Sequence, residues 1–260
     1  MPEVTGNAAQ GTPCWMNLVG PDAATAESFY GPLLGWEFER AGAEYGGYVV
    51  ATVGGKKVAG ITGGMPGPAF WGIYFATDDC DGAAKRATDA GAELVTPPEE
   101  VGPLGRMAVL TDPQGATFGL WQGREHIGAE LVNEPGALAW NELVTADTAA
   151  SAAFYGTVLG VSNAPIQPGV DYLTLTVAGR PVCGIFGVPR PQLDAAQNGN
   201  AAWKVYFAVP NADTTAQTAT THGGKILQPP INSPFGRFTV LTDPLGAEFA
   251  AISPTPPHPQ

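Results

Sequence analysis

The chain contains the same stretch of sequence twice, and this duplication limits the folds that it can adopt. Trp15–Gly35 reads WMNLVGPDAATAESFYGPLLG and Trp140–Gly160 reads WNELVTADTAASAAFYGTVLG, so one offset aligns the two without a gap. A second pair, Trp71–Gln122 and Trp203–Ser253, shares the runs W-x-x-Y-F-A, G-R and V-L-T-D-P-x-G-A-x-F. The chain is therefore a tandem of two units of roughly 110 residues, and its fold must be one that can be built twice.

Each unit contains two modules with the order β-α-β-β-β. The first module begins with a strand at 14–19, and Asp22 and Gly35 are suited to the two ends of the helix that follows. The other strands are expected at 36–39, 45–53, 57–62, 71–76, 93–96, 106–111 and 117–121, and then at 139–144, 171–177, 181–186, 203–209, 225–228, 237–241 and 248–252. Helices are expected from 79 to 90, at 147–159 and at 212–221, and a loop is expected at 189–200.

This organisation predicts five segments along the chain. They are an N-terminal tail at 1–11, a first domain at 12–122, a linker at 123–137, a second domain at 138–253 and a C-terminal tail at 254–260. The linker contains polar residues and a Pro-Gly turn, which favours a semi-ordered connection.

Charge and composition exclude several classes of protein. The formal net charge of −12 would repel a nucleic acid, and no apolar run approaches the ~20 residues that a membrane span needs. The start of the sequence shows neither the basic nor the apolar region of a signal peptide. Three cysteines without C-x-x-C spacing indicate buried hydrophobic residues rather than disulfides. We therefore expect a cytoplasmic protein that binds neither nucleic acid nor membrane, as a monomer or a homodimer.

The repeated pattern resembles a known superfamily. A strand, then D-x-x-x-x-x-x-F-Y-x-x-x-L-G, then D-P-x-G before a hydrophobic strand, is similar to the glyoxalase, bleomycin-resistance and extradiol-dioxygenase (vicinal oxygen chelate) superfamily. The runs at Val132–Gly136 and Trp140–Leu143 resemble its double-domain actinobacterial members labelled hydroxylase or secreted antigen. The resemblance implies an α+β fold, with two modules per domain forming an incompletely closed barrel around a ligand-binding cup. Fold alone does not fix function, since this superfamily includes lyases, dioxygenases, transferases and drug-binding proteins.

The metal ligands of that superfamily do not transfer to this chain. Metal-dependent members place a ligand, commonly His, on the first strand of a module and a Glu after D-P-x-G. These positions fall here on Trp15, Trp140, Trp71, Trp203, Gly119 and Ala250. None of these side chains binds a divalent ion, and His126, His222 and His258 are expected at the surface. We therefore expect no metal and no cofactor.

The two cups are expected to differ in charge. Because side chains alternate along a strand, the residue two after the ligand position also faces the cup, and it is Asn17 in the first unit and Glu142 in the second. Glu248 faces the second cup nearer its rim, where the first unit has Thr117. A partly desolvated Glu142 is suited to general acid or base catalysis, with Glu248 as a second carboxylate. Alternatively, Glu142 pairs with Arg237 or with the backbone, and Glu248 is solvated.

The remaining candidates are aromatic and basic. Trp15, Trp71, Trp140 and Trp203 either fill the barrels or form apolar walls for a flat ligand. Four further residues recur in both units and could contact a ligand at the mouth of the cup: Tyr48, Tyr172, Arg106 and Arg237. Either arginine could instead form a structural ion pair with the Asp of T-D-P.

These observations leave three functions open. The first is a metal-free enzyme, plausible in natural-product tailoring, that acts on a hydrophobic or aromatic small molecule with Glu142 as acid or base. The second is a protein that sequesters such a molecule and so confers resistance. The third is a metal-dependent lyase or dioxygenase with unusual ligands.

Overall fold

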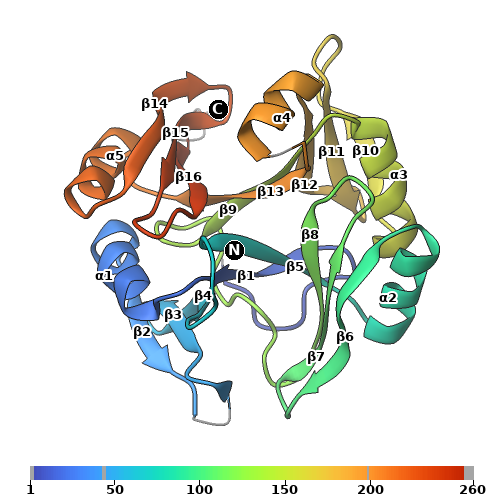
Figure 1. Ribbon diagram of the computed structural model, residues 1–260, viewed down its shortest axis with the longest axis horizontal. Helices are drawn as coiled ribbons and strands as arrows, with labels where there is room; N and C mark the ends of the chain where they lie inside the picture. Colours follow the sequence, from blue (N-terminus) through green and yellow to red (C-terminus); the bar gives the residue numbers. More distant parts are fainter. Residues whose placement is uncertain (1–2, 43–44, 198, 255–260) are drawn as a thin grey trace.

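The structure is a computed structural model that describes residues 3–42, 45–197 and 199–254. The strands form two eight-stranded sheets, one in each half of the chain (Figure 1). The first sheet has the order β2-β3-β4-β1-β5-β8-β7-β6, with β1 (Pro13–Val19), β2 (Glu37–Arg40), β3 (Val49–Val53), β4 (Lys56–Thr62), β5 (Phe70–Ala76), β6 (Glu93–Val101), β7 (Gly105–Thr111) and β8 (Thr117–Gly123). The second has the order β10-β11-β12-β9-β13-β16-β15-β14, with β9 (Leu138–Thr145), β10 (Ser162–Pro165), β11 (Tyr172–Val177), β12 (Arg180–Gly187), β13 (Ala202–Ala208), β14 (Lys225–Ser233), β15 (Gly236–Thr242) and β16 (Glu248–Pro254).

In each sheet the two modules are joined through their first strands. Strand β1 pairs antiparallel with β5, and β1 and β5 pair in parallel with β4 and β8, the last strands of their modules. The second sheet repeats this with β9, β13, β12 and β16. Each sheet curves but does not close into a barrel. The α+β fold with two incompletely closed domains is confirmed.

The helices begin and end where the sequence indicates. The main ones are α1 (Ala23–Leu34), α2 (Cys80–Asp89), α3 (Thr148–Leu159) and α5 (Ala212–Thr221). The side chains of Asp22, Asp79, Asp147 and Asn211 accept hydrogen bonds from the first turn of these helices. Gly35 and Gly160 end α1 and α3 in the left-handed conformation, with φ of 71° and 73°, which glycine adopts without strain.

The two sheets pack back to back, and their concave faces point away from each other (Figure 1). Strands β5 and β13 meet at the centre, and α1 contacts α5 while α2 contacts α3. One continuous hydrophobic core therefore includes buried residues of both domains. The three cysteines are buried, as expected.

Two matching hydrogen-bond relays cross the domain boundary inside this core. The Trp71 indole donates to the Tyr30 hydroxyl at 3.0 Å, and Tyr30 donates to Asp243 of the other domain at 3.1 Å. Trp203 donates to Tyr155 at 2.9 Å, and Tyr155 donates to Asp112 at 2.8 Å. Each aspartate also accepts two backbone N–H groups of its own turn. The F-Y and D-P-x-G motifs therefore join the two domains.

Four elements differ from those expected. The segment expected as a loop contains a further helix, α4 (Arg190–Gln197), and β10 was not foreseen. Strands β6 and β14 continue through their Pro-Pro pairs to Val101 and Ser233, with register shifts at that place. Both are edge strands, where proline is tolerated because one side needs no hydrogen-bond donor. In the described part of the chain, no helix is long and apolar enough to cross a membrane.

Candidate functional site

A partly buried carboxylate, Glu142, lies on the cup face of the second sheet. Strand β9 carries it near the middle of the sheet, between β12 and β13. The Tyr206 hydroxyl donates to Glu142 Oε1 at 3.0 Å. The Tyr172 hydroxyl accepts the Trp140 indole N–H at 2.9 Å and lies close enough to the carboxylate to lower the pKa of Glu142. Tyr206 from β13 therefore holds the carboxylate, and Tyr172 from β11 lies beside it.

A glycine makes room for one of these phenols. A Cβ atom added to Gly184 on β12 would collide with the Tyr172 hydroxyl. Gly184 pairs directly with Glu142 in the sheet register. The glycine therefore lets the Tyr172 ring lie across β12 and reach the carboxylate.

Burial is the main influence on the pKa of Glu142. Desolvation raises this pKa above its ordinary value of 4.5, while the Tyr206 hydroxyl, the Lys204 ammonium and the Tyr172 hydroxyl partly oppose the rise. Burial, followed by the adjacent Glu142 charge, raises the pKa of both tyrosines, so they remain protonated donors at neutral pH. A carboxylate whose pKa is raised in this way is a stronger base than an exposed carboxylate, which suits it to proton transfer.

Aromatic side chains surround the carboxylate. Trp140, Tyr172 and Tyr206 lie on the same strand faces as Glu142, by strand alternation and register. Phe186 stands beside Tyr172 and Phe238 beside Tyr206, with ring centroids 6.2 and 6.1 Å apart. Phe186 is exposed and Phe238 is partly buried. The second cup therefore has aromatic walls that remain accessible.

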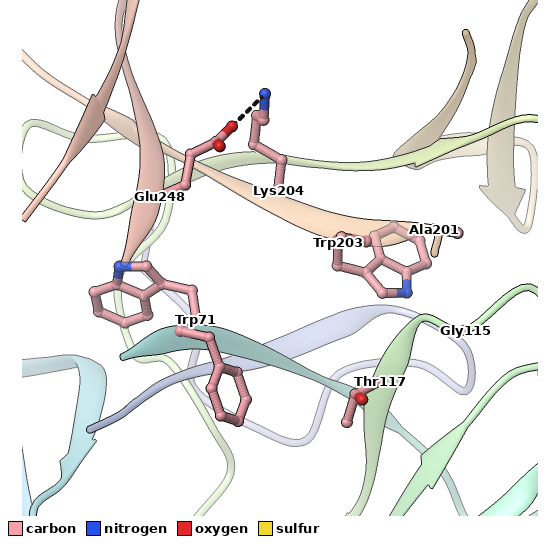
Figure 2. Close-up of a pocket in the computed structure, with 9 residues that line it drawn as sticks. Trp71, Gly115, Thr117, Ala201, Trp203, Lys204 and Glu248 are labelled. Atoms are coloured by element: carbon pink, nitrogen blue, oxygen red, sulfur yellow. Dashed lines mark ion pairs between the residues drawn. The ribbon is translucent and has the colours of Figure 1, made fainter. Parts of the chain in front are cut away.

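An ion pair adjoins this group at the boundary between the domains. Lys204 Nζ lies 2.8 Å from Glu248 Oε1 (Figure 2). Both residues line a groove of about 230 Å³ together with Trp203 and with Phe70, Trp71 and Thr117 of the first domain. Glu248 is therefore paired rather than simply solvated.

The first cup is closed by the chain's own linker. The His126 ring packs edge-on against Trp15, with centroids 4.5 Å apart, and lies 5.5 Å from the Trp121 ring. Trp121 donates its indole N–H to the His126 carbonyl at 2.8 Å, and Ala129 N–H donates to the Cys14 carbonyl at 2.8 Å. Trp15 and Trp121 are consequently only 5% and 8% exposed. His126 is thus a packing residue and not the surface residue expected.

The first cup has the uncharged Asn17 at the position that corresponds to Glu142. Asn17 donates to the Thr62 hydroxyl at 3.1 Å, and Trp15 donates to the Tyr48 hydroxyl at 2.8 Å. The first cup therefore has the same Trp–Tyr hydrogen bond as the second cup, but an amide stands where the second cup has a carboxylate.

Trp71 and Trp203 do not lie on the cup faces of the two sheets. Each indole donates to a helix tyrosine within the shared core, and both tryptophans also line the groove between the domains. Their neighbours Gly72 and Lys204 pair with Asn17 and Glu142, so those neighbours occupy the cup face. The expectation that these two tryptophans form cup walls is wrong, since a shift of one residue along a strand reverses the face.

Arg106 and Arg237 are held by helices rather than by a cup. Arg106 Nε lies 2.7 Å from Asp81 at the start of α2, and Arg237 Nε lies 2.6 Å from Asp213 at the start of α5. The alternative pairing with Asp112 or Asp243 is also wrong, because those carboxylates accept tyrosine hydroxyls. Glu142 does not pair with Arg237 but accepts the Tyr206 hydroxyl.

The donor set does not fit a divalent metal. Among the described residues no group of three or more His, Cys, Asp or Glu side chains comes together. The carboxylate of Glu142 already accepts the Tyr206 hydroxyl, and Glu248 forms an ion pair with the Lys204 ammonium group. Divalent ions in this fold need several oxygen or imidazole ligands with open positions, so no step is assigned to a metal.

Sequence reasoning missed Tyr206 and Lys204. Both follow Trp203 on β13, and alternation from Glu142 across the β9–β13 pair would have placed them on the cup face. The signal was a difference between the repeats, since Lys204 corresponds to Gly72 in the run W-x-x-Y-F-A.

Similarity to known proteins agrees with this architecture. The model of the "Glyoxalase-like domain" family matches residues 15–121 and 138–252. The chain is 40% identical over 257 residues to "Putative glyoxylase CFP32" of Mycobacterium tuberculosis, covering 95% of this chain and 96% of that protein. It is 36% identical over 271 residues to "Anthracycline biosynthesis protein DnrV" of Streptomyces peucetius, covering 94% of each.

Solved structures share the fold at low sequence identity. The Mn(II)-bound glyoxalase from Novosphingobium aromaticivorans superposes with a TM-score of 0.64 at 15% identity, covering 93% of this chain and 82% of that one. The 2,3-dioxygenase LapB from Pseudomonas sp. KL28 gives a TM-score of 0.63 at 15% identity, covering 97% of each. The family model matches both halves of the chain, a relative is similar over nearly the whole length, and each half forms a curved sheet of two paired modules. The chain therefore belongs to the glyoxalase-like family of the vicinal oxygen chelate superfamily.

Proposed function

We propose that the protein binds a hydrophobic or aromatic small molecule in its second cup and transfers a proton on it, with Glu142 as acid or base and without a metal. The observation that carries this proposal is the partly buried Glu142 carboxylate, which accepts the Tyr206 hydroxyl and lies beside Tyr172 among accessible aromatic side chains. Similarity to DnrV supports a tailoring reaction in natural-product biosynthesis. We propose a cytoplasmic location and a monomer or homodimer.

The chemistry follows from the position of the carboxylate. When a ligand presents a C–H group next to a carbonyl, Glu142 takes the proton, the C–H bond breaks and its electron pair moves to the carbonyl oxygen. The protonated Glu142 then returns a proton to the same or another atom. Tyr172 and Tyr206 fix the carboxylate during both steps, and the aromatic walls orient a flat ring.

The first domain is proposed to support the second rather than to bind a ligand. Its cup has an amide in place of the carboxylate, and His126 and Ala129 of the linker cover its tryptophans. The two units therefore share a fold but differ in their function.

Deuterium exchange into 1-tetralone tests the proposed reaction. This aromatic ketone has exchangeable protons beside its carbonyl, and incorporation of solvent deuterium is measured by mass spectrometry. We expect the native protein to accelerate exchange, and Glu142→Gln to reduce the acceleration at least 100-fold while the Kd for 1-tetralone changes less than threefold. Glu39→Gln is the control, because that carboxylate is exposed on β2.

The same assay separates catalysis from sequestration. A sequestering protein needs only the aromatic walls, so it would bind 1-tetralone and leave its exchange rate at the buffer value. Equal exchange by native protein and Glu142→Gln would remove Glu142 from the mechanism.

A further inference from the structure

We propose that Lys204, held by Glu248, is the specificity-determining residue of the second cup, and that its ammonium group donates a hydrogen bond to a carbonyl or phenolic oxygen of an uncharged aromatic ligand. This inference rests on the proposed function and specifies the ligand class for the same cup.

The sheet register places Lys204 beside the carboxylate. Lys204 pairs directly with Glu142 across β9 and β13, and residues opposite each other in an antiparallel pair present their side chains on the same face. Tyr206, two residues further along β13, lies on that face and donates to Glu142. Lys204 is therefore next to the proposed reacting group.

The ammonium group retains donors for a ligand. A lysine ammonium has three N–H groups, and in the described part of the chain its one ion-pair partner is Glu248. The side chain of Lys204 is 20% exposed, so it is accessible but partly shielded from water. Glu248 fixes the position of the ammonium group, and the groove that both residues line provides space beside it.

Charge favours an uncharged acceptor over an anion. The ion pair leaves Lys204 neutralised by Glu248, while Glu142 adds negative charge to the cup. The whole chain has a formal net charge of −12, which repels anionic ligands. A ketone or phenol oxygen accepts from Lys204 without that repulsion, and a ketone so polarised releases its neighbouring proton more readily.

The tandem shows that the fold does not need this ion pair. The corresponding positions in the first domain are Gly72 and Thr117, with Asn17 in place of Glu142. The same strands form there without any of the three charges. All three charged residues occur in the cup that the linker does not close, which associates them with a ligand.

Two ring systems that differ only in the oxygen test the inference. The Kd values of 1-tetralone and tetralin, its analogue without the carbonyl, are measured by NMR titration on the full chain. We expect native protein to bind 1-tetralone about tenfold more tightly than tetralin, from one charge-assisted hydrogen bond. Lys204→Met should remove that preference and leave the Kd of tetralin unchanged, and Lys204→Arg should keep most of it. Lys85→Met, which removes an exposed ion pair on α2, should change neither Kd.

The outcomes are distinguishable. If both compounds bind and Lys204→Met keeps the preference for 1-tetralone, the inference fails and the proposed function stands. Equal weakening of both compounds by Lys204→Met indicates a structural role and also overturns it. If neither compound binds the native protein, the inference and the proposed function both fail.

Discussion

Glu142 carries the proposed chemistry, and its environment links activity to stability. Its pKa in the folded protein is raised above 4.5, chiefly by burial. Such a group contributes stability that is fully present below the unfolded pKa and is lost as pH rises through the folded pKa. Ionisation of Glu142 in the folded protein therefore costs stability, as is common where a group serves function.

This predicts a pH-dependent difference between the native protein and Glu142→Gln. Because glutamine does not ionise, the free energy of unfolding of Glu142→Gln should rise relative to that of the native protein as the pH rises from 4 to 8. Urea unfolding at several pH values measures the difference. A constant difference over this range would show that the pKa of Glu142 is not raised.

Gly184 gives a second prediction, with a matched control in the other domain. Gly184→Ala places a methyl group against the Tyr172 hydroxyl and should move that phenol from Glu142, lowering the exchange rate with 1-tetralone at least tenfold. Gly60→Ala does the same to Tyr48 in the first cup, where Asn17 replaces the carboxylate. Both variants should lose stability by about 1–3 kcal/mol, but Gly60→Ala should keep its activity. Equal loss of activity in both would contradict the assignment to one cup.

The linker is the element that makes the two cups unequal. His126 lies between Trp15 and Trp121, and burial lowers its pKa to about 4. A base with a lowered folded pKa contributes stability that is present above its unfolded pKa and lost as pH falls through the folded pKa. His126 therefore destabilises the protein as pH falls from 6.5 toward 4.

We expect His126→Ala to cost about 1–3 kcal/mol at pH 7, because the two indoles lose an aromatic neighbour. Because the variant lacks this imidazole, its free energy of unfolding should also fall less than that of the native protein between pH 6.5 and pH 4. Unfolding curves at both pH values measure both effects, with His222→Ala at the end of α5 as the control. Exchange into 1-tetralone should be unchanged, and lost exchange would place the site in the first cup.

Repeats and local signals predicted most elements of this fold. The duplication gave two domains of paired modules, and Asp22 and Gly35 marked the ends of α1. Helix α4 was missed because Pro189 and the Gln- and Asn-rich residues after it are typical of a loop. The extension of β6 was missed because Pro97 and Pro98 indicate a strand end, although an edge strand tolerates them.

The candidate site was harder to predict, because it depends on which strand faces meet. Alternation identified Glu142, but Trp71 and Trp203 were assigned by family position and lie on the opposite face. The partnership of Arg237 with Asp213 also depends on how α5 packs on β15, which no local pattern in the sequence records.

At the scale of the whole molecule, the domains form one cooperative unit. Their core is continuous, and each domain supplies a tyrosine to an aspartate of the other. Burial raises the pKa of both aspartates.

We expect a single calorimetric unfolding transition. Tyr155→Phe should lower the free energy of unfolding by about 1–3 kcal/mol because Asp112 loses a hydrogen-bond donor. Two separate transitions would contradict this account.

A crystal structure of the protein with 1-tetralone would show directly whether Glu142 contacts the ligand. We expect ligand density in the second cup alone, with the ring against Trp140 and with the proton-bearing carbon beside the Glu142 carboxylate. Density in the first cup, or a ligand in the second cup that contacts neither residue, would contradict it.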